Sequence, residues 1–234
     1  MLLGSGFEGQ SKIISITITQ SYLPRESNAI RGEKEWGDTP EPPIATKKAI
    51  EQMFDGAALT YDRIGPSIFT KFGARLVERM PFAPGSRVLD IATGKGAVLL
   101  PAARCVGPEG HVTGIDISSG ILKEAEQVAH KEGLSNVDFK KMDAEHLEFP
   151  DQSFDAVTCA FALFLFPDME AALREMYRVC KPDGYVGVTL FDMTPPTDES
   201  RLADFDAANY GISCWNADAT TTGLCTPGSE SFAQ

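Results

Sequence analysis

The sequence predicts an α/β domain with a doubly wound, mainly parallel sheet, and three observations lead to this prediction. Between residues 87 and 191, short apolar runs alternate with longer segments of helical periodicity, as in parallel sheets covered by helices. Three of the apolar runs end at or beside an acid, namely Asp90, Asp116 and Asp143. A loop of small residues follows the first run. Ligands of such sheets bind at the carboxyl ends of the strands, so these features predict a binding site there.

The first half of this region is predicted to hold two strands, each followed by a helix. The runs at 87–91 and 111–116 have the length and composition of buried strands. The segments 97–105 and 119–132 carry apolar residues at helical spacing. Pro101 falls inside the first helix, so we expect that helix to be short or kinked.

The second half continues the alternation with three more strands, predicted at 136–142, 154–160 and 185–191. Asp168 is the predicted N-cap of the helix before the last strand, because its side chain can accept hydrogen bonds from the first turn. A turn at 182–184 separates that helix from the strand. Right-handed crossovers between these elements complete the doubly wound sheet.

The chain is expected to divide into three regions. Residues 1–45 are predicted to be a poorly ordered leader, with a short edge strand or oligomer contact as the alternative, because residues 14–19 alternate like a strand. Residues 46–191 are the predicted core, which opens with two cap helices. Residues 192–234 hold seven acids, one base and no convincing strand pattern, so they are predicted to be an irregular acidic tail.

The loop from Asp90 to Gly96 was compared with the patterns of three cofactor classes. A P-loop requires a Lys-Ser or Lys-Thr pair, but Lys95 is followed by glycine. A dinucleotide fingerprint that starts at Gly94 requires a third glycine where this chain has Leu99. The pattern Asp-x-Ala-x-Gly-x-Gly resembles motif I of the class I S-adenosylmethionine-dependent methyltransferases. Its glycines would let a ligand approach the backbone closely.

Later segments resemble the ubiquinone and menaquinone C-methyltransferase group within that class. They are Lys141–Pro150, Asp151–Val157, Phe161–Asp168 and Lys181–Gly184, and the similarity extends over residues 54–191. The resemblance implies S-adenosylmethionine as the cofactor, a Rossmann-like fold and a C-terminal antiparallel strand pair. The tail offers no clear match to that pair, so we expect it to be missing or altered. An uncovered strand edge would then favour homo-oligomers or aggregation and leave turnover poor.

The candidate cofactor residues lie at the predicted strand ends. Asp116 is placed to accept hydrogen bonds from a ribose, because it follows the glycine loop by about 20 residues. Asp90 is a candidate partner for the ammonium group of the ligand. The resemblance implies that Asp143 and Ala144 lie beside the adenine, and that Lys95 replaces a small hydroxyl residue; we expect this lysine to point to solvent. The full set is Asp90, Ala92, Thr93, Gly94, Lys95, Gly96, Asp116, Ile117, Asp143, Ala144, Ala160 and Phe161.

The candidate acceptor residues are Phe54, Tyr61 and Phe164, for which ordinary packing is the alternative. The loop at 163–166, where the resembled family often has His or Asn, is entirely apolar, so no catalytic base is assigned. His146 is expected to be a surface residue. The five cysteines are widely spaced without a C-x-x-C pair, so no metal site is predicted.

Charge and hydropathy limit the partners. The net charge is −12 and no cluster of Lys and Arg exceeds a pair, which disfavours nucleic acid as a partner. The chain has no run of 18 apolar residues and no secretory signal pattern, so no membrane span and a cytoplasmic location are expected. We therefore predict methyl transfer to a small hydrophobic or aromatic acceptor, such as a quinol, phenol or other natural product. A cofactor-binding homologue with weak or no activity is the alternative.

Overall fold

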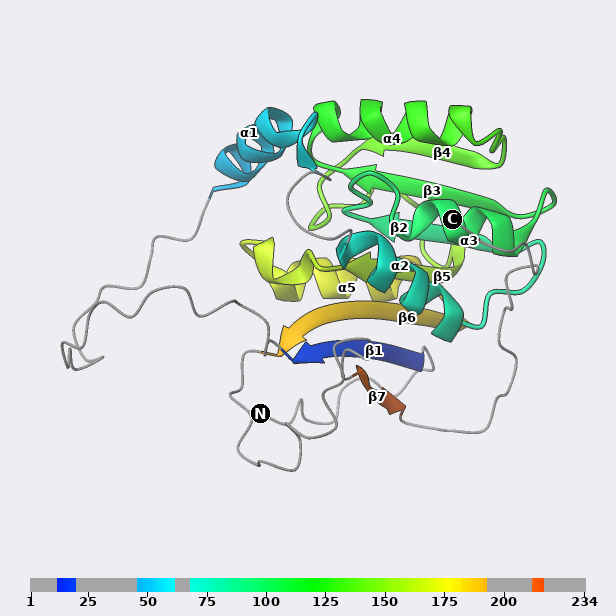
Figure 1. Cartoon of the computed structure of the whole chain (residues 1–234). Coiled ribbons are helices and arrows are strands. Elements are labelled where there is room, and N and C mark those ends of the chain that lie inside the picture. Colours follow the sequence, from blue (N-terminus) through cyan, green and yellow to red (C-terminus); the bar gives the residue numbers. More distant parts are fainter. Residues whose placement is uncertain (1–11, 20–45, 62–67, 193–211, 217–234) are drawn as a thin grey trace, which may run out of the picture.

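The computed structural model describes residues 12–19, 46–61, 68–192 and 212–216, which form a seven-stranded sheet with helices on both faces (Figure 1). The strand order is β4-β3-β2-β5-β6-β1-β7, and all neighbours are parallel except β1 and β7. The strands are β1 (Lys12–Thr19), β2 (Arg87–Ile91), β3 (His111–Asp116), β4 (Val137–Lys141), β5 (Phe154–Ala160), β6 (Cys180–Asp192) and β7 (Ile212–Asn216). From β2 the chain builds the sheet outward in one direction through β3 and β4, and then returns to the other side of β2 with β5. Ligands of doubly wound sheets bind at such a reversal, at the carboxyl ends of the strands.

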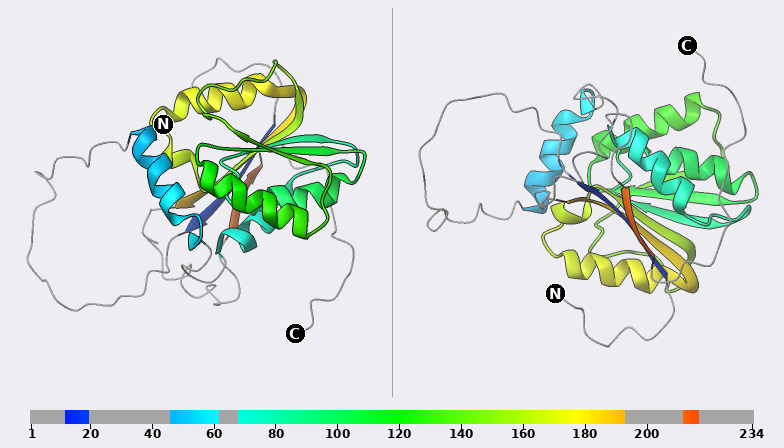
Figure 2. Two further views of the ribbon diagram at one scale, coloured as in Figure 1. Left: turned by 90° about the horizontal axis from the view of Figure 1, so that it is seen from above. Right: turned by 60° about the horizontal axis from the view of Figure 1, so that its bottom comes forward.

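The helices cover the two faces unequally. Helices α2 (Ile68–Arg79), α3 (Leu99–Val106) and α4 (Ser119–Lys131) lie on one face of the sheet, and α5 (Met169–Val179) lies on the other (Figure 2). Helix α1 (Lys47–Ala57) lies beside α4 at the carboxyl ends of the strands (Figure 1). A 3-10 turn, η2 (Leu163–Leu165), precedes α5. Among the described residues, no helix is both long and apolar enough to cross a membrane.

The central strands are buried on both faces, as expected for a parallel sheet. On one face Leu89 and Ile91 of β2 pack in a cluster with Met176 of α5. On the other face Val88 packs in a second cluster with Leu76 of α2. All five of these side chains are inaccessible to solvent. A polar side chain at the centre of this sheet is therefore removed from solvent.

Local signals set the starts of three helices. Thr46, Ser118 and Asp168 each accept a hydrogen bond from a backbone N–H in the first turn of α1, α4 and α5. The predicted capping role of Asp168 is confirmed. Such caps satisfy backbone donors that the helix itself leaves without partners. The alternation of strands and helices is also confirmed, with most boundaries close to those predicted.

Two predictions within the core need correction or refinement. Strand β6 begins at Cys180 and includes the predicted turn at 182–184, because Cys180 already pairs with Phe154 across a register irregularity in β5. Helix α3 is short, as expected, but it begins at Leu99. Pro101 is therefore in the first turn, the part of a helix that tolerates proline best.

The edge of the sheet beyond β6 differs most from expectation. Strand β1 pairs with β6 in parallel, and β7 pairs with β1 in the antiparallel sense. The expectation of a poorly ordered leader is therefore wrong for Lys12–Thr19, which form a strand, although this strand lies between β6 and β7 and not at the edge that the alternative expected. The expectation that the tail contains no strand is wrong for Ile212–Asn216. Strand β6 is covered, so its edge gives no reason to predict self-association. The remaining residues of the leader and tail lie outside those that the structure describes.

Gly73 on α2 permits the close contact between α2 and the segment that leads into α3. A Cβ at Gly73 would lie 2.3 Å from the carbonyl oxygen of Ala97. We expect Gly73→Ala to lower the free energy of unfolding by about 1–3 kcal/mol, because overpacking against backbone outweighs the higher helix propensity of alanine. Gly56→Ala in α1 is the matched control, since its Cβ would meet nothing within 4 Å. Urea denaturation of both variants tests this; equal stabilities would contradict it.

Candidate functional site

A cavity lies at the carboxyl ends of the central strands, between α1, the loop after β4 and the segment around η2, and we call it the main cavity because most of the predicted site residues line it. It encloses about 710 Å³ of space that opens to solvent. Ten of the predicted residues line it together: Phe54, Tyr61, Ala92, Gly94, Asp116, Ile117, Asp143, Ala144, Ala160 and Phe161. Lys47, Ile50, Met142, Glu145, Leu165 and Phe166 are among the other lining residues. The cavity therefore joins polar groups from the strand ends to an apolar wall.

A second, smaller cavity of about 350 Å³ adjoins the first and shares Tyr61, Gly94 and Phe161 with it. This second cavity is also lined by three residues of the glycine loop segment, namely Asp90, Thr93 and Lys95. Lys95 is partly buried there, so the expectation that it points to solvent is not what the structure shows.

The glycine loop bends through three residues with positive φ angles. They are Ala92, at 51°, Gly94, at 55°, and Gly96, at 87°. The missing Cβ of Gly94 leaves open space beside the main cavity, since no atom lies within 4 Å of its position. At Gly96 a Cβ would lie 2.9 Å from Leu100, and this glycine lines neither cavity. Gly94 therefore allows a ligand to approach, whereas Gly96 allows the loop to pack on its own helix.

Asp90 is bound inside the protein on both of its carboxylate oxygens. It accepts hydrogen bonds from the hydroxyl groups of Thr93, at 2.6 Å, and Thr158, at 2.8 Å. Its side chain is 1% exposed, and burial raises its pKa to about 6 in spite of these hydrogen bonds. Asp90 therefore joins β2, the glycine loop and β5. Asp90 also lines the smaller cavity, where the sequence led us to expect a bond to a ligand ammonium group.

Asp116 connects the end of β3 with the glycine loop. One carboxylate oxygen accepts the N–H of Gly94 and the other accepts the N–H of Ser118, each at 3.0 Å. Burial raises the pKa of this carboxyl group. Each oxygen retains capacity for a further hydrogen bond, and the side chain lines the main cavity. Hydroxyl donors of a ligand thus fit this position.

A residue of α1 supports this arrangement from outside the sheet. Asp55 accepts hydrogen bonds from the hydroxyl of Ser118, at 2.6 Å, and from the N–H of Gly120, at 2.9 Å. These hydrogen bonds lower the pKa of Asp55, and the bond from Ser118 has the largest effect. A carboxylate at the start of α4 also interacts favourably with the helix dipole. The sequence analysis did not single out Asp55, because its partners lie more than 60 residues away.

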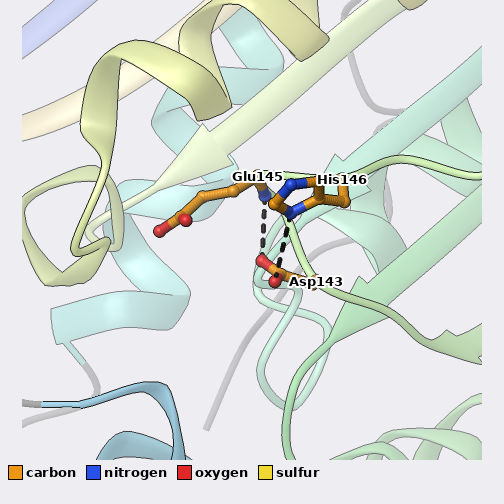
Figure 3. Close-up of side chains that lie close together, drawn as sticks. All are labelled: Asp143, Glu145 and His146. Carbon is orange, nitrogen blue, oxygen red and sulfur yellow. Dashed lines mark hydrogen bonds and ion pairs between the residues drawn. The ribbon is translucent and has the colours of Figure 1, made fainter.

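The loop after β4 gathers three ionisable side chains at the edge of the cavity. Asp143 accepts the N–H of Glu145 at 3.0 Å and lies 3.6 Å from Nδ1 of His146 (Figure 3). Lys47 of α1 lies 2.6 Å from Asp143 and 2.5 Å from Glu145, so a cation from the chain itself already balances the carboxylates. The His146 side chain is 80% exposed, which confirms it as a surface residue.

The Lys47 contacts alter the ionisation of their partners. Burial raises the pKa of Asp143, but the hydrogen bond and charge of Lys47 lower it more, so the pKa lies below its ordinary value. Burial lowers the pKa of Lys47, and the two carboxylates raise it more, so its net shift is upward. Both shifts favour the charged pair. Glu145 is itself buried and accepts the N–H of Asp168, which ties this loop to the start of α5.

An aromatic cluster forms the other wall of the cavity. Tyr61 stacks on Phe69 at 5.5 Å between ring centroids and lies 6.0 Å from Phe54. Phe161 meets Phe69 and Phe72 edge-on, at 5.5 and 5.8 Å. Phe161 also has a positive φ of 56°, a conformation that bulky residues rarely adopt. The fold thus holds an aromatic ring at the end of β5, where it borders both cavities.

The structure separates one predicted acceptor residue from the others. Phe164 is 49% exposed and lines neither cavity, whereas its neighbours Leu165 and Phe166 line the main one. At the 3-10 turn η2, Leu163 is buried in the core, Phe164 is exposed, and the next two residues line the cavity. The sequence analysis also missed Lys47 and Glu145. The acid-rich segment after β4 was a usable signal for Glu145, but no local pattern marks Lys47.

Comparison with known proteins is consistent with this geometry. A family model described as a methyltransferase domain matches residues 83–223. Aklanonic acid methyltransferase DauC of Streptomyces is 42% identical over 143 residues, which are 61% of this chain and 65% of that protein. Nocamycin O-methyltransferase of Saccharothrix syringae is 39% identical over 137 residues, 58% of this chain and 49% of that protein. Demethylmenaquinone methyltransferase of Geobacillus kaustophilus is 37% identical over 142 residues, 59% and 61% of the two chains.

Solved structures share the fold. The [4+2]-cyclase SpnF has a TM-score of 0.55 and 30% identity, over 62% of this chain and 60% of that one. A SAM-dependent methyltransferase of Aquifex aeolicus has a TM-score of 0.54 and 25% identity, over 62% of this chain and 76% of that one. The chain spans about half to two thirds of the length of the curated relatives named above. The match of the family model over most of the chain, together with the Rossmann-like sheet, shows that the chain belongs to the methyltransferase-domain family.

Proposed function

We propose that this protein transfers a methyl group from S-adenosylmethionine to a small hydrophobic or aromatic acceptor. One observation carries the proposal: Gly94, Asp116 and Asp143 face the same cavity as the aromatic side chains of Tyr61 and Phe161. A polar end suited to a nucleoside and an apolar end suited to a flat acceptor therefore share one space. The sequence identity with methyltransferases supports the assignment of the reaction.

The side chains around the cavity fit the parts of this cofactor. We assign Asp116 to the ribose hydroxyl groups, and Asp143 with Ala144 to the adenine. Gly94 leaves room beside the backbone for the amino-acid end. Lys95, at the smaller cavity, supplies a positive charge that suits the cofactor carboxylate. Asp90 acts indirectly in this scheme, because its bonds to two threonines hold the glycine loop in place.

The chemistry asks little of the protein beyond positioning. The cofactor supplies an electrophilic methyl group on a sulfonium, which is a good leaving group. The protein holds the acceptor in line with that methyl group and excludes water, and such positioning can lower a barrier by several kcal/mol, up to about 7–11 kcal/mol. The ring faces of the aromatic wall also attract a sulfonium cation. No residue is assigned as a base, so an acceptor that ionises readily, such as a phenol or quinol, suits the site best.

The names of the relatives point to the same class of acceptor. They refer to aklanonic acid, nocamycin and demethylmenaquinone, which are small molecules. We extend only this class to the present chain, together with the expectation that nucleic acid is not a substrate.

The test combines binding with turnover. We expect calorimetry to show binding of S-adenosylmethionine and adenosylhomocysteine but not of NADH, and we expect methyl transfer to members of a panel of phenols, quinols and amines. Tyr61→Ala should lower kcat/KM for the acceptor about 3- to 10-fold, because buried aromatic contacts contribute about 0.5–1.5 kcal/mol beyond area burial. Phe164→Ala is the control, since its ring lies outside both cavities. Equal losses in the two variants would contradict the assignment of the acceptor wall.

A second candidate is a cofactor-binding protein that does not transfer methyl groups. Two observations favour it: no base is assigned at the cavity, and one protein of similar structure is named as a [4+2]-cyclase. An apolar cavity of defined shape also suits the folding of a flexible hydrophobic substrate. Cofactor binding without methyl transfer to any acceptor in the panel would support this candidate over the first.

A further inference from the structure

Helix α1 is attached to the core by a polar contact on each of three successive turns. Lys47 binds Asp143 and Glu145, as described above. One turn later Glu51 forms an ion pair with Lys141 of β4. A further turn on, Asp55 accepts hydrogen bonds at the start of α4. Residues spaced by four lie on one face of a helix, so one face of α1 makes all three contacts, although its side chains remain partly or largely exposed to solvent.

The apolar contribution of α1 is directed at the cavity instead of at the protein core. Ile50 and Phe54, also spaced by four, line the main cavity. No residue within α1 is buried, and Ala58 just beyond its end is the nearest buried side chain. Most helices of globular proteins are held chiefly by a buried apolar face. Helix α1 therefore depends on its polar contacts, and on whatever fills the cavity beneath it.

Each polar contact of α1 ends at or beside a residue that faces the cavity. Lys47 reaches Asp143 and Glu145 directly. Glu51 reaches Lys141, which directly precedes the cavity residue Met142. The third contact, from Asp55, reaches Ser118, whose backbone N–H binds Asp116. The contacts that hold α1 in place therefore also hold Asp143 and Asp116, the two acids assigned to the cofactor.

We propose that Lys47, Glu51 and Asp55 are positioning residues that hold α1 closed over the bound cofactor, so that cofactor release requires these contacts to break. The inference rests on the proposed function, since it takes the cavity to be the cofactor site. Individual exposed ion pairs contribute little, and such weakly held segments are the ones that open during turnover. Retention of the cofactor is therefore set by charges on α1 that do not touch it.

The test is a charge swap at the ion pair of Glu51 and Lys141. Glu51 and Lys141 line neither cavity, and their side chains are 29% and 50% exposed, so substitutions there should leave the fold intact. We expect Glu51→Lys and Lys141→Glu each to raise the dissociation rate of adenosylhomocysteine about two- to fivefold, in line with the small energies of exposed pairs. The double variant should return toward the wild-type rate. We expect this recovery to be partial, because Lys141→Glu also places a negative charge near Asp55.

The matched control is an ion pair of the same kind on another helix. Glu170 and Arg174 of α5 are exposed and paired, and Glu170→Lys should leave the dissociation rate unchanged. Stopped-flow displacement measures the rates, and thermal melting confirms that each variant is folded. Unchanged rates in both single variants, or no recovery in the double variant, would overturn the proposal. A wild-type protein that fails to bind adenosylhomocysteine would instead overturn the proposed function.

Discussion

Replacing Asp116 by alanine should weaken the binding of adenosylhomocysteine by about 1–3 kcal/mol, because hydrogen bonds to a charged, buried group are lost. Both carboxylate oxygens are held in place by backbone N–H groups, so the acid is already oriented before the ligand arrives. Such preorganisation makes its contribution to binding large. Calorimetry with wild type and variant measures the difference, and an unchanged affinity would remove Asp116 from the site.

The same residue should make binding depend on pH. Burial raises the pKa of Asp116, so the carboxylate should begin to take up a proton at a higher pH than an exposed aspartate does. The affinity of the wild type should accordingly fall as the solution is acidified through that pKa, and the alanine variant should lack this contribution. Glu126→Ala on the exposed side of α4 is the control for the loss of one negative charge, and it should change neither affinity nor its pH dependence.

Replacing Asp90 by alanine should lower the free energy of unfolding by about 1–3 kcal/mol relative to Asp90→Asn. The alanine variant would leave the hydroxyl group of Thr93 without its buried acceptor, and an unsatisfied buried group costs about 1–3 kcal/mol. The hydroxyl group of Thr158 would keep only its longer contact with the carbonyl oxygen of Leu89, at 3.3 Å. Asp90→Asn is the matched variant, because its amide can bond both hydroxyl groups without a buried charge. Denaturation at pH 7 should therefore find Asp90→Asn at least as stable as the wild type. An alanine variant as stable as Asp90→Asn would contradict this role.

The sign of the pH effect at Asp90 is opposite to that of a salt-bridged aspartate. Its pKa is about 6 in the folded protein against an ordinary value of 3.8, so the folded state holds the proton more tightly. Between these values rising pH removes the proton from the unfolded chain first and so favours unfolding. The free energy of unfolding should therefore be lower by about 3 kcal/mol above pH 6 than at low pH, and this decrease should be absent in Asp90→Asn. Stability curves between pH 4 and 7 for the two proteins test this; parallel curves would show that Asp90 does not contribute.

Much of the fold could be predicted because its signals are local. The apolar runs of β2, β3 and β5 match their predicted bounds, since a short buried strand needs only a continuous apolar segment. Asp168 was recognisable as a cap because the backbone N–H that donates to its side chain lies only three residues away in the chain. The glycine loop and the acids at strand ends were likewise visible, because the topology of a parallel sheet brings strand ends to one edge.

The errors occurred where the partner is distant or the strand is short. Strand β7 has five residues, and nothing in Ile212–Asn216 shows that β1, from the opposite end of the chain, will pair with it. Phe164 and Phe166 look alike in sequence, but a 3-10 turn places only Phe166 at the cavity.

The sequence by itself determined the alternating α/β core, the glycine loop and the presence of acids where a nucleoside is expected, because residue spacing along a strand or helix encodes them. Only the tertiary structure decided how those acids are used. It bonds Asp90 internally, it places Lys47 beside Asp143, 96 residues away, and it brings Asp55 to Ser118, 63 residues away. Contacts over such separations depend on the packing of whole elements, and no periodicity along the chain records them.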